Sequence, residues 1–158
     1  MKRHTTRLYN LIFPIWIFWM VPSLLWLLLP ANFLWDSLVL LAAAGWLRLQ
    51  GKKELWKHSI VKVWLIGFAA DFAGAALSLV VMLLLNTLLD SHTFDPYYFP
   101  GATLHAIPGV CLAGGLIWRL NRRYSFGKAG ISEAMAGRLS LVLAVFTAPY
   151  LMLLPMYY

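Results

Sequence analysis

The sequence predicts an all-helical integral membrane protein, a polytopic bundle of about five transmembrane helices, on the basis of three observations. Hydrophobic residues make up 61% of the 158 residues and charged residues only 12%, whereas ordinary soluble domains carry about 25% charged residues. Residues 63–89 form an apolar run with a single charge inside it, that of Asp71. The basic residues cluster at the ends of the apolar segments, as Lys and Arg do beside spanning helices. We therefore expect residues 1–158 to form one transmembrane domain.

The apolar run 63–89 is long enough to cross a bilayer as a helix. A helix rises about 1.5 Å per residue, so this run spans roughly 40 Å, more than the roughly 30 Å hydrocarbon core of a membrane. A segment inside lipid must pair its own backbone N–H and C=O groups, which a helix does. The run 63–89 is therefore the central spanning helix of the prediction.

Two more spanning helices are expected before it, over 8–29 and 33–49. The basic start and the apolar run after it are also typical of a signal peptide, but the run is long, contains several Trp and ends without a small-residue cleavage site. We therefore predict that 8–29 is an uncleaved helix. Residues 30–32, Pro-Ala-Asn, predict a tight turn. Asp36 then lies near the first turn of the second helix, where a carboxylate can cap free N–H groups.

The last two spanning helices are expected over 102–120 and 139–157. In the first of them, Pro108 beside Gly109 predicts a bend and a close approach to another helix. The second carries small residues at four-residue spacing, which predict a face that packs against another helix. These small residues are Ala136, Ser140, Ala144 and Ala148.

The basic residues predict the topology. With five spans, all 13 Lys and Arg residues fall on the side of the N-terminus, which gives an inside N-terminus and an outside C-terminus in a plasma (inner) membrane. The odd number of spans depends on the short helix 33–49, because a re-entrant segment there would reverse the later helices. The three clusters are Lys2, Arg3 and Arg7; Arg48, Lys52, Lys53, Lys57 and Lys62; and Arg119, Arg122, Arg123, Lys128 and Arg138.

The basic connector 48–60 has a second interpretation. It carries Leu55 and Trp56 beside lysines, a pattern that predicts a short helix on the membrane surface. Membrane lipids, and anionic headgroups in particular, are therefore candidate partners at the basic loops. Nucleic acid is an unsuitable partner despite the net charge of +7, because the basic residues flank apolar segments and form no separate face.

Asp71 leads the candidate functional residues. At 100° per residue, small and polar residues share its side of the helix and form a narrow stripe that should face protein or water. No Lys or Arg lies centrally in any predicted span, so a buried salt bridge is disfavoured and a proton, a bound cation or a hydrated cavity is favoured. The residues of this stripe are Gly67, Gly74, Ala75 and Ser78, with Asn86 about two turns beyond.

Three interpretations of Asp71 stay open: a pathway for protons or small cations, a polar contact that holds helices together, and recognition of a lipid headgroup or a partner subunit. His105 could form a proton relay with Asp36, since histidine titrates near neutral pH. Asp90 and Asp95 lie in an outer loop without Lys or Arg and could attract cations to a pore mouth.

The sequence carries no motif of an enzyme. No nucleophile has a neighbouring base, no HExxH pair occurs, and no glycine-rich phosphate loop is complete. No metal site and no cofactor are predicted, since no Cys/His zinc spacing is present. We therefore expect a channel or facilitative transporter for protons or small cations that works as a homo-oligomer. The alternative is a non-transporting membrane subunit that anchors, stabilises or regulates a larger complex.

Overall fold

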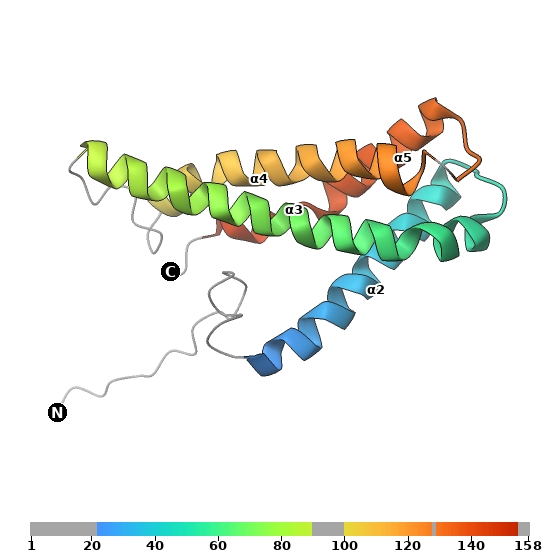
Figure 1. Ribbon diagram of the computed structural model, residues 1–158, viewed down its shortest axis with the longest axis horizontal. Coiled ribbons are helices and arrows are strands. Elements are labelled where there is room, and N and C mark those ends of the chain that lie inside the picture. Colours follow the sequence, from blue (N-terminus) through green and yellow to red (C-terminus); the bar gives the residue numbers. More distant parts are fainter. Residues whose placement is uncertain (1–21, 90–99, 128, 155–158) are drawn as a thin grey trace.

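The computed structural model describes residues 22–89, 100–127 and 129–154, and its regular elements there are all helices (Figure 1). Three of them, α2, α3 and α4, are long and apolar enough to cross a membrane, which confirms the all-helical class. The described elements are α2 (Pro22–Trp46), α3 (Lys52–Leu89), α4 (Gly101–Leu120), the π-helix η2 (Asn121–Ser125), α5 (Glu133–Thr147) and the 3-10 helix η3 (Tyr150–Leu153).

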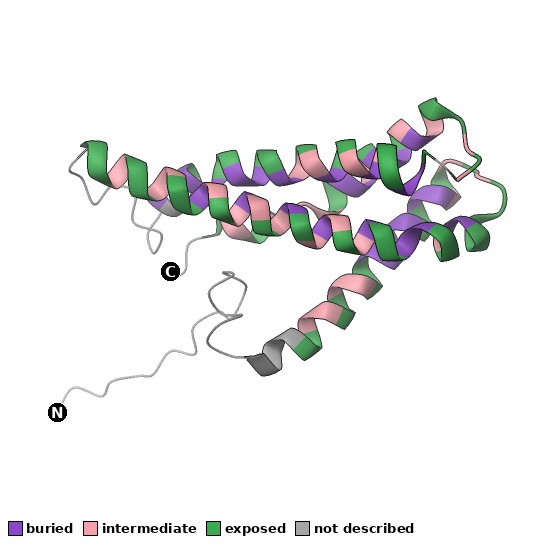
Figure 2. Ribbon diagram, viewed as in Figure 1, coloured by how far each residue is buried: buried purple, intermediate pink, exposed green. Residues whose placement is uncertain are grey.

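The antiparallel pair of α3 and α4 forms the main body of the structure (Figure 1). The α2–α3 and α4–α5 connectors lie at the same end of this body, and α5 packs against both α2 and α4. α2 contributes to the core only through its second half, where Leu40, Ala43 and Ala44 are buried, and its first half diverges from α3 (Figure 2). In that first half, Trp26 is 80% exposed.

Two glycines bring α3 and α4 into backbone contact. A Cβ atom placed on Gly74 would lie 2.6 Å from the Gly109 carbonyl oxygen and 3.0 Å from the Cβ of Ala113. Small residues permit such an approach between spanning helices, whose association relies on close packing. The close approach predicted for Gly109 is therefore confirmed, and α4 continues through Pro108 as one helix.

The turn predicted at residues 30–32 is wrong. α2 runs through Pro30 as a single helix, so the expected helices 8–29 and 33–49 do not meet there. A proline removes one N–H and frees one carbonyl, here that of Trp26, and spanning helices tolerate this better than soluble ones do. The described residues contain three helices long enough to span, against about five expected for the whole chain, and most of 8–29 lies outside the described residues.

Two other helix boundaries also differ from the prediction. α3 begins at Lys52, so the expected surface helix is the first part of α3, because buried Leu55, Ser59 and Ile60 continue the same packed face into the membrane segment. The last helix begins at Glu133, where the Ser132 hydroxyl accepts a hydrogen bond of 3.3 Å from the Met135 N–H, and it ends at Thr147 shortly before Pro149.

The predicted small-residue face of the last helix is confirmed. Ala136, Ser140 and Ala144 are all buried, and α5 packs against α2 and α4. The next small residue, Ala148, has its Cβ atom 3.9 Å from the position of a Cβ on Gly114 of α4. The four-residue spacing thus predicted correctly that this helix packs against another helix.

Candidate functional site

Two carboxylates from different helices meet between α2 and α3. Asp36 of α2 is only 2% exposed, and its Oδ2 lies 3.6 Å from the position that a Cβ atom would occupy on Gly67. Gly67 is one turn before Asp71 on α3, and Asp71 lies within electrostatic range of Asp36. The bare glycine therefore lets the Asp36 carboxylate lie against the α3 backbone beside the second acid.

Both acids lie well inside their helices. Asp36 is ten residues before the end of α2 at Trp46, and Asp71 is nineteen residues after the start of α3 at Lys52. At 1.5 Å per residue these separations are roughly 15 Å and 28 Å. Both acids therefore lie far from the connector between α2 and α3, in the interior of the predicted bilayer.

An aromatic pair joins α2 and α3 close to the site. Phe33 and Trp64 contact each other edge to face, with ring centroids 6.1 Å apart and an interplanar angle of 80°. Phe33 is three residues before Asp36, and Trp64 is three residues before Gly67, so each ring lies on the same helix face as the site. The Trp64 Nε1 and the Ser37 hydroxyl are also buried without a hydrogen-bond partner, so polar atoms accompany the acids.

The acids have no counter-charge in the described part of the chain. Asp36 Oδ2 and Asp71 Oδ1 are buried without a hydrogen-bond partner. The salt bridge found among the described residues joins Arg122 to Glu133 over 2.6 Å at the connector end. Buried charges normally pair, bind a cation or take up a proton, because an isolated ion is costly in a medium of low dielectric constant. The pair can therefore hold a proton or a small cation.

The structure places the other predicted site residues in different surroundings. The Ser78 hydroxyl is buried at the contact between α3 and α4 and donates to the Gly74 carbonyl over 3.0 Å. Asn86 is half-buried farther along α3, and its Oδ1 has no hydrogen-bond partner. Asp90 and Asp95, the expected cation-attracting residues, lie outside the described residues.

The predicted roles of Asp36 need one correction. A capping role is wrong because α2 starts at Pro22, so Asp36 lies deep inside the helix and not in its first turn. The relay with His105 stays a prediction: His105 Nδ1 is 2.8 Å from the Gly101 carbonyl oxygen of its own helix, and α4 packs chiefly on α3 and α5. No hydrogen bond found in the described residues joins the two side chains.

The sequence analysis missed a buried polar network near the connectors. The Ser59 hydroxyl of α3 donates to the Ser125 carbonyl over 3.2 Å, and the Ser125 hydroxyl donates to Asn121 Oδ1 over 2.6 Å. The Asn121 amide then donates to the Ile117 carbonyl over 2.9 Å. Asn121 and Ser125 lie four residues apart, a spacing that could have indicated a shared helix face. The network joins α3 to the π-helix η2, and π-helical turns often mark functional sites.

We expect Asn121→Ala to destabilise the protein by about 2 kcal/mol, since it leaves the buried Ser125 hydroxyl without its acceptor. Asn121 and Ser125 are both buried, so bulk water does not reach the Ser125 hydroxyl. Thermal unfolding in detergent measures the effect, with the exposed Arg123→Ala as control. Equal melting temperatures for Asn121→Ala and the parent would show that the network contributes nothing.

These features define a class of protein. Over the described residues it is helical, with three helices long and apolar enough to cross a membrane and two acids without a counter-charge between the first two of these helices. Among the described residues, no group of three or more His, Cys, Asp or Glu side chains could hold a metal ion. Comparison with protein-family models, with curated proteins and with solved structures finds no match.

Proposed function

We propose that the protein is a small integral membrane channel or facilitative transporter for protons or small cations, and that Asp36 and Asp71 lie on its route. The observation that supports this proposal is a pair of acids without a described counter-charge, one of them 2% exposed, that lie within electrostatic range of each other between α2 and α3. Intramembrane acids commonly line ion pathways because their burial is otherwise unfavourable. A cation that passes between α2 and α3 would meet both carboxylates.

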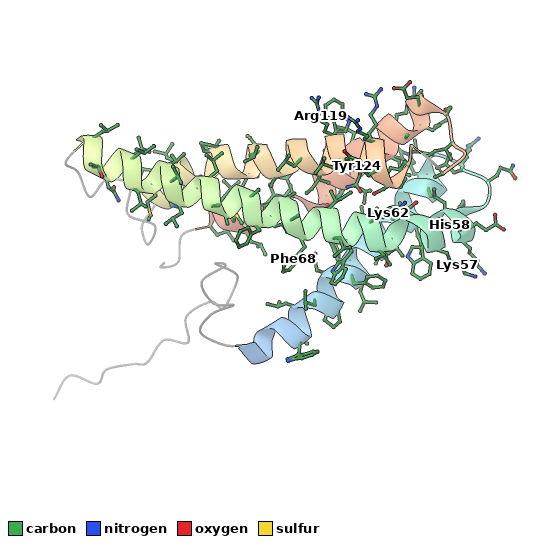
Figure 3. All side chains as sticks on the ribbon, viewed as in Figure 1. Lys57, His58, Lys62, Phe68, Arg119 and Tyr124 are labelled. Carbon is green, nitrogen blue, oxygen red and sulfur yellow. The ribbon has the colours of Figure 1, made fainter. Side chains whose placement is uncertain are left out.

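The position of the basic residues supports an orientation for this protein. Both basic connectors, between α2 and α3 and between α4 and α5, lie at one end of the structure (Figure 1). Figure 3 labels Lys57 and Lys62 on α3 and Arg119 on α4, all in the half that contains the connectors. We propose that this end faces the cytoplasm at a plasma membrane. Because so few helices scarcely enclose a pore, we also propose a homo-oligomer.

Ion flux into liposomes that hold the purified full-length protein tests the proposed function. Protons, sodium, potassium and chloride are scanned with the parent, with Asp71→Asn and with Glu133→Gln. Glu133→Gln removes the same charge from an exposed site in the first turn of α5 and should leave flux unchanged. We expect cation or proton flux in the parent and a reduction on the order of tenfold in Asp71→Asn. Absence of flux for every ion from folded parent protein would refute permeation.

A second candidate function is a non-transporting membrane subunit that anchors, stabilises or regulates a larger complex. The side chains of Ser78 and His105 favour it, because each bonds to a carbonyl of its own helix. These polar groups therefore do not continue from the acid pair as a polar pathway across the membrane. Affinity purification of tagged protein from its native membrane would then recover stoichiometric membrane partners.

A further inference from the structure

A shallow, open surface depression of ≈ 640 Å³, called the cavity below, lies at the connector between α2 and α3 and is lined by residues 45 and 48–54. Three of its lining residues are basic and one is acidic: Arg48, Lys52, Lys53 and Glu54. Ligand pockets commonly have volumes of roughly 300–1,000 Å³. The cavity is therefore large enough for a small ligand, and its charge favours an anion.

The basic side chains of the cavity have no acidic partner within the described part of the chain, where the salt bridge found joins Arg122 to Glu133. Lys52 folds back over the end of α2, with its Nζ 3.7 Å from the position of a Cβ on Gly45. Glu54 turns toward Gly51, with its Oε2 3.7 Å from the position of a Cβ there. Arg48 and Lys53 thus remain available to an anion.

Arg48 occupies a backbone position that normally takes glycine. The Leu49 N–H bonds to the Ala44 carbonyl over 2.9 Å and the Arg48 N–H bonds to the Gly45 carbonyl over 3.0 Å, the pattern of a Schellman motif at the end of α2. Arg48 has a φ of 53°, in the left-handed region that disfavours residues with a Cβ atom. The left-handed turn therefore gains nothing from a Cβ atom at this position, and the Arg48 guanidinium extends from an exposed site at the connector.

The cavity lies at the level expected for lipid headgroups. Trp46, at the end of α2, is 77% exposed beside it, and exposed tryptophans concentrate at the boundary between hydrocarbon and water. Arg binds phosphate oxygens through two parallel N–H donors, and Lys binds them as a point charge. We propose that the cavity binds the phosphate group of an anionic phospholipid, with Arg48 and Lys53 as its ligands. This site is separate from the acid pair and does not depend on permeation.

Calorimetric titration of the purified full-length protein in a nonionic detergent tests the proposal. The ligands are short-chain phosphatidylglycerol, short-chain phosphatidylcholine and inorganic phosphate. We expect the parent to prefer phosphatidylglycerol to phosphatidylcholine, and the double variant Arg48→Gly with Lys53→Gln to lose affinity for phosphatidylglycerol on the order of tenfold or more. Glycine suits the φ of Arg48, so this variant should melt no lower than the parent.

The matched control is Lys57→Gln with Lys62→Gln, which removes two positive charges from the same helix outside the cavity. We expect its affinity for phosphatidylglycerol to stay within about twofold of the parent value, since neither lysine contacts the ligand. If both double variants lose affinity for phosphatidylglycerol equally, the effect is due to overall charge, and the proposed site is wrong. Equal affinity for the two lipids would also overturn it. If inorganic phosphate binds as tightly as phosphatidylglycerol, the ligand is free phosphate and the proposal of a lipid ligand is wrong.

Discussion

Replacing Gly109 with alanine should destabilise the protein by about 3 kcal/mol, the upper end of the usual cost of overpacking. A Cβ atom at this position would collide with the Ser78 hydroxyl and with the Gly74 carbonyl oxygen of α3. The carbonyl belongs to backbone inside a regular helix and cannot turn aside as a flexible side chain could. The collision therefore separates α3 from α4, the two helices that form the main body of the structure.

Unfolding in detergent, followed by circular dichroism, measures the loss. Gly115→Ala on the same helix is the matched control, because nothing lies within 4 Å of the Cβ atom that it adds. Alanine at an open helical position should stabilise by about 0.5–1 kcal/mol, the usual difference in helix propensity from glycine. The two substitutions should thus have opposite signs. A Gly109→Ala protein as stable as Gly115→Ala would mean that α3 and α4 do not approach as closely as described.

Hydropathy and length identified α3 and α4 from the sequence, but the other helices and the helix ends were less predictable. The run from Val63 identified α3 correctly, whereas its start at Lys52 depends on Leu55 and Ser59 being buried by other segments, which no local pattern reveals. At Pro30, by contrast, a local pattern was misleading. A proline followed by Ala and Asn is a turn signal in a soluble chain, but an apolar helix in lipid can continue after one lost hydrogen bond.

The candidate site was predictable in part for a similar reason. Asp71 is identifiable from the sequence because a lone acid in an apolar run is unusual. Its neighbour Asp36 was assigned to a helix cap because the turn before it was misplaced. The approach of Asp36 to Gly67 depends on how α2 and α3 pair, which is a tertiary property. The same limit explains the missed contact of Ser59 with Ser125, which are 66 residues apart in sequence.

The stripe of small and polar residues on α3 contacts two different helices. Gly67 and Asp71 lie toward α2, where they meet Asp36, while Gly74 and Ser78 pack against Gly109 of α4. The close packing of the stripe therefore lies at its Gly74 end, and the three interpretations of Asp71 stay predictions. If Asp71 lies on the proposed route, substitutions at the two ends should have different effects, with stability lost at Gly74 and transport lost at Asp71.

Neutralising the acid pair should strongly reduce transport while preserving the fold. In Asp36→Asn and in Asp71→Asn we expect flux to fall on the order of tenfold or more, because each variant removes half of the proposed ion site. If both carboxylates hold one ion, the double variant should be no worse than either single variant, since residues that act as a unit are not additive. Thr87→Val, which alters an exposed side chain bonded to its own helix, should leave flux unchanged.

Thermal unfolding of the same variants separates transport from a structural role. Asp36 Oδ2 and Asp71 Oδ1 have no hydrogen-bond partner, so replacing either carboxylate with a neutral amide of the same shape should leave the melting temperature unchanged or raise it. An acid that holds helices together would show the reverse: a lower melting temperature or altered assembly. Reduced flux from variants that melt at or above the parent temperature would therefore assign the pair to the route. Lower melting temperatures in both single variants would instead identify the pair as a structural contact between α2 and α3.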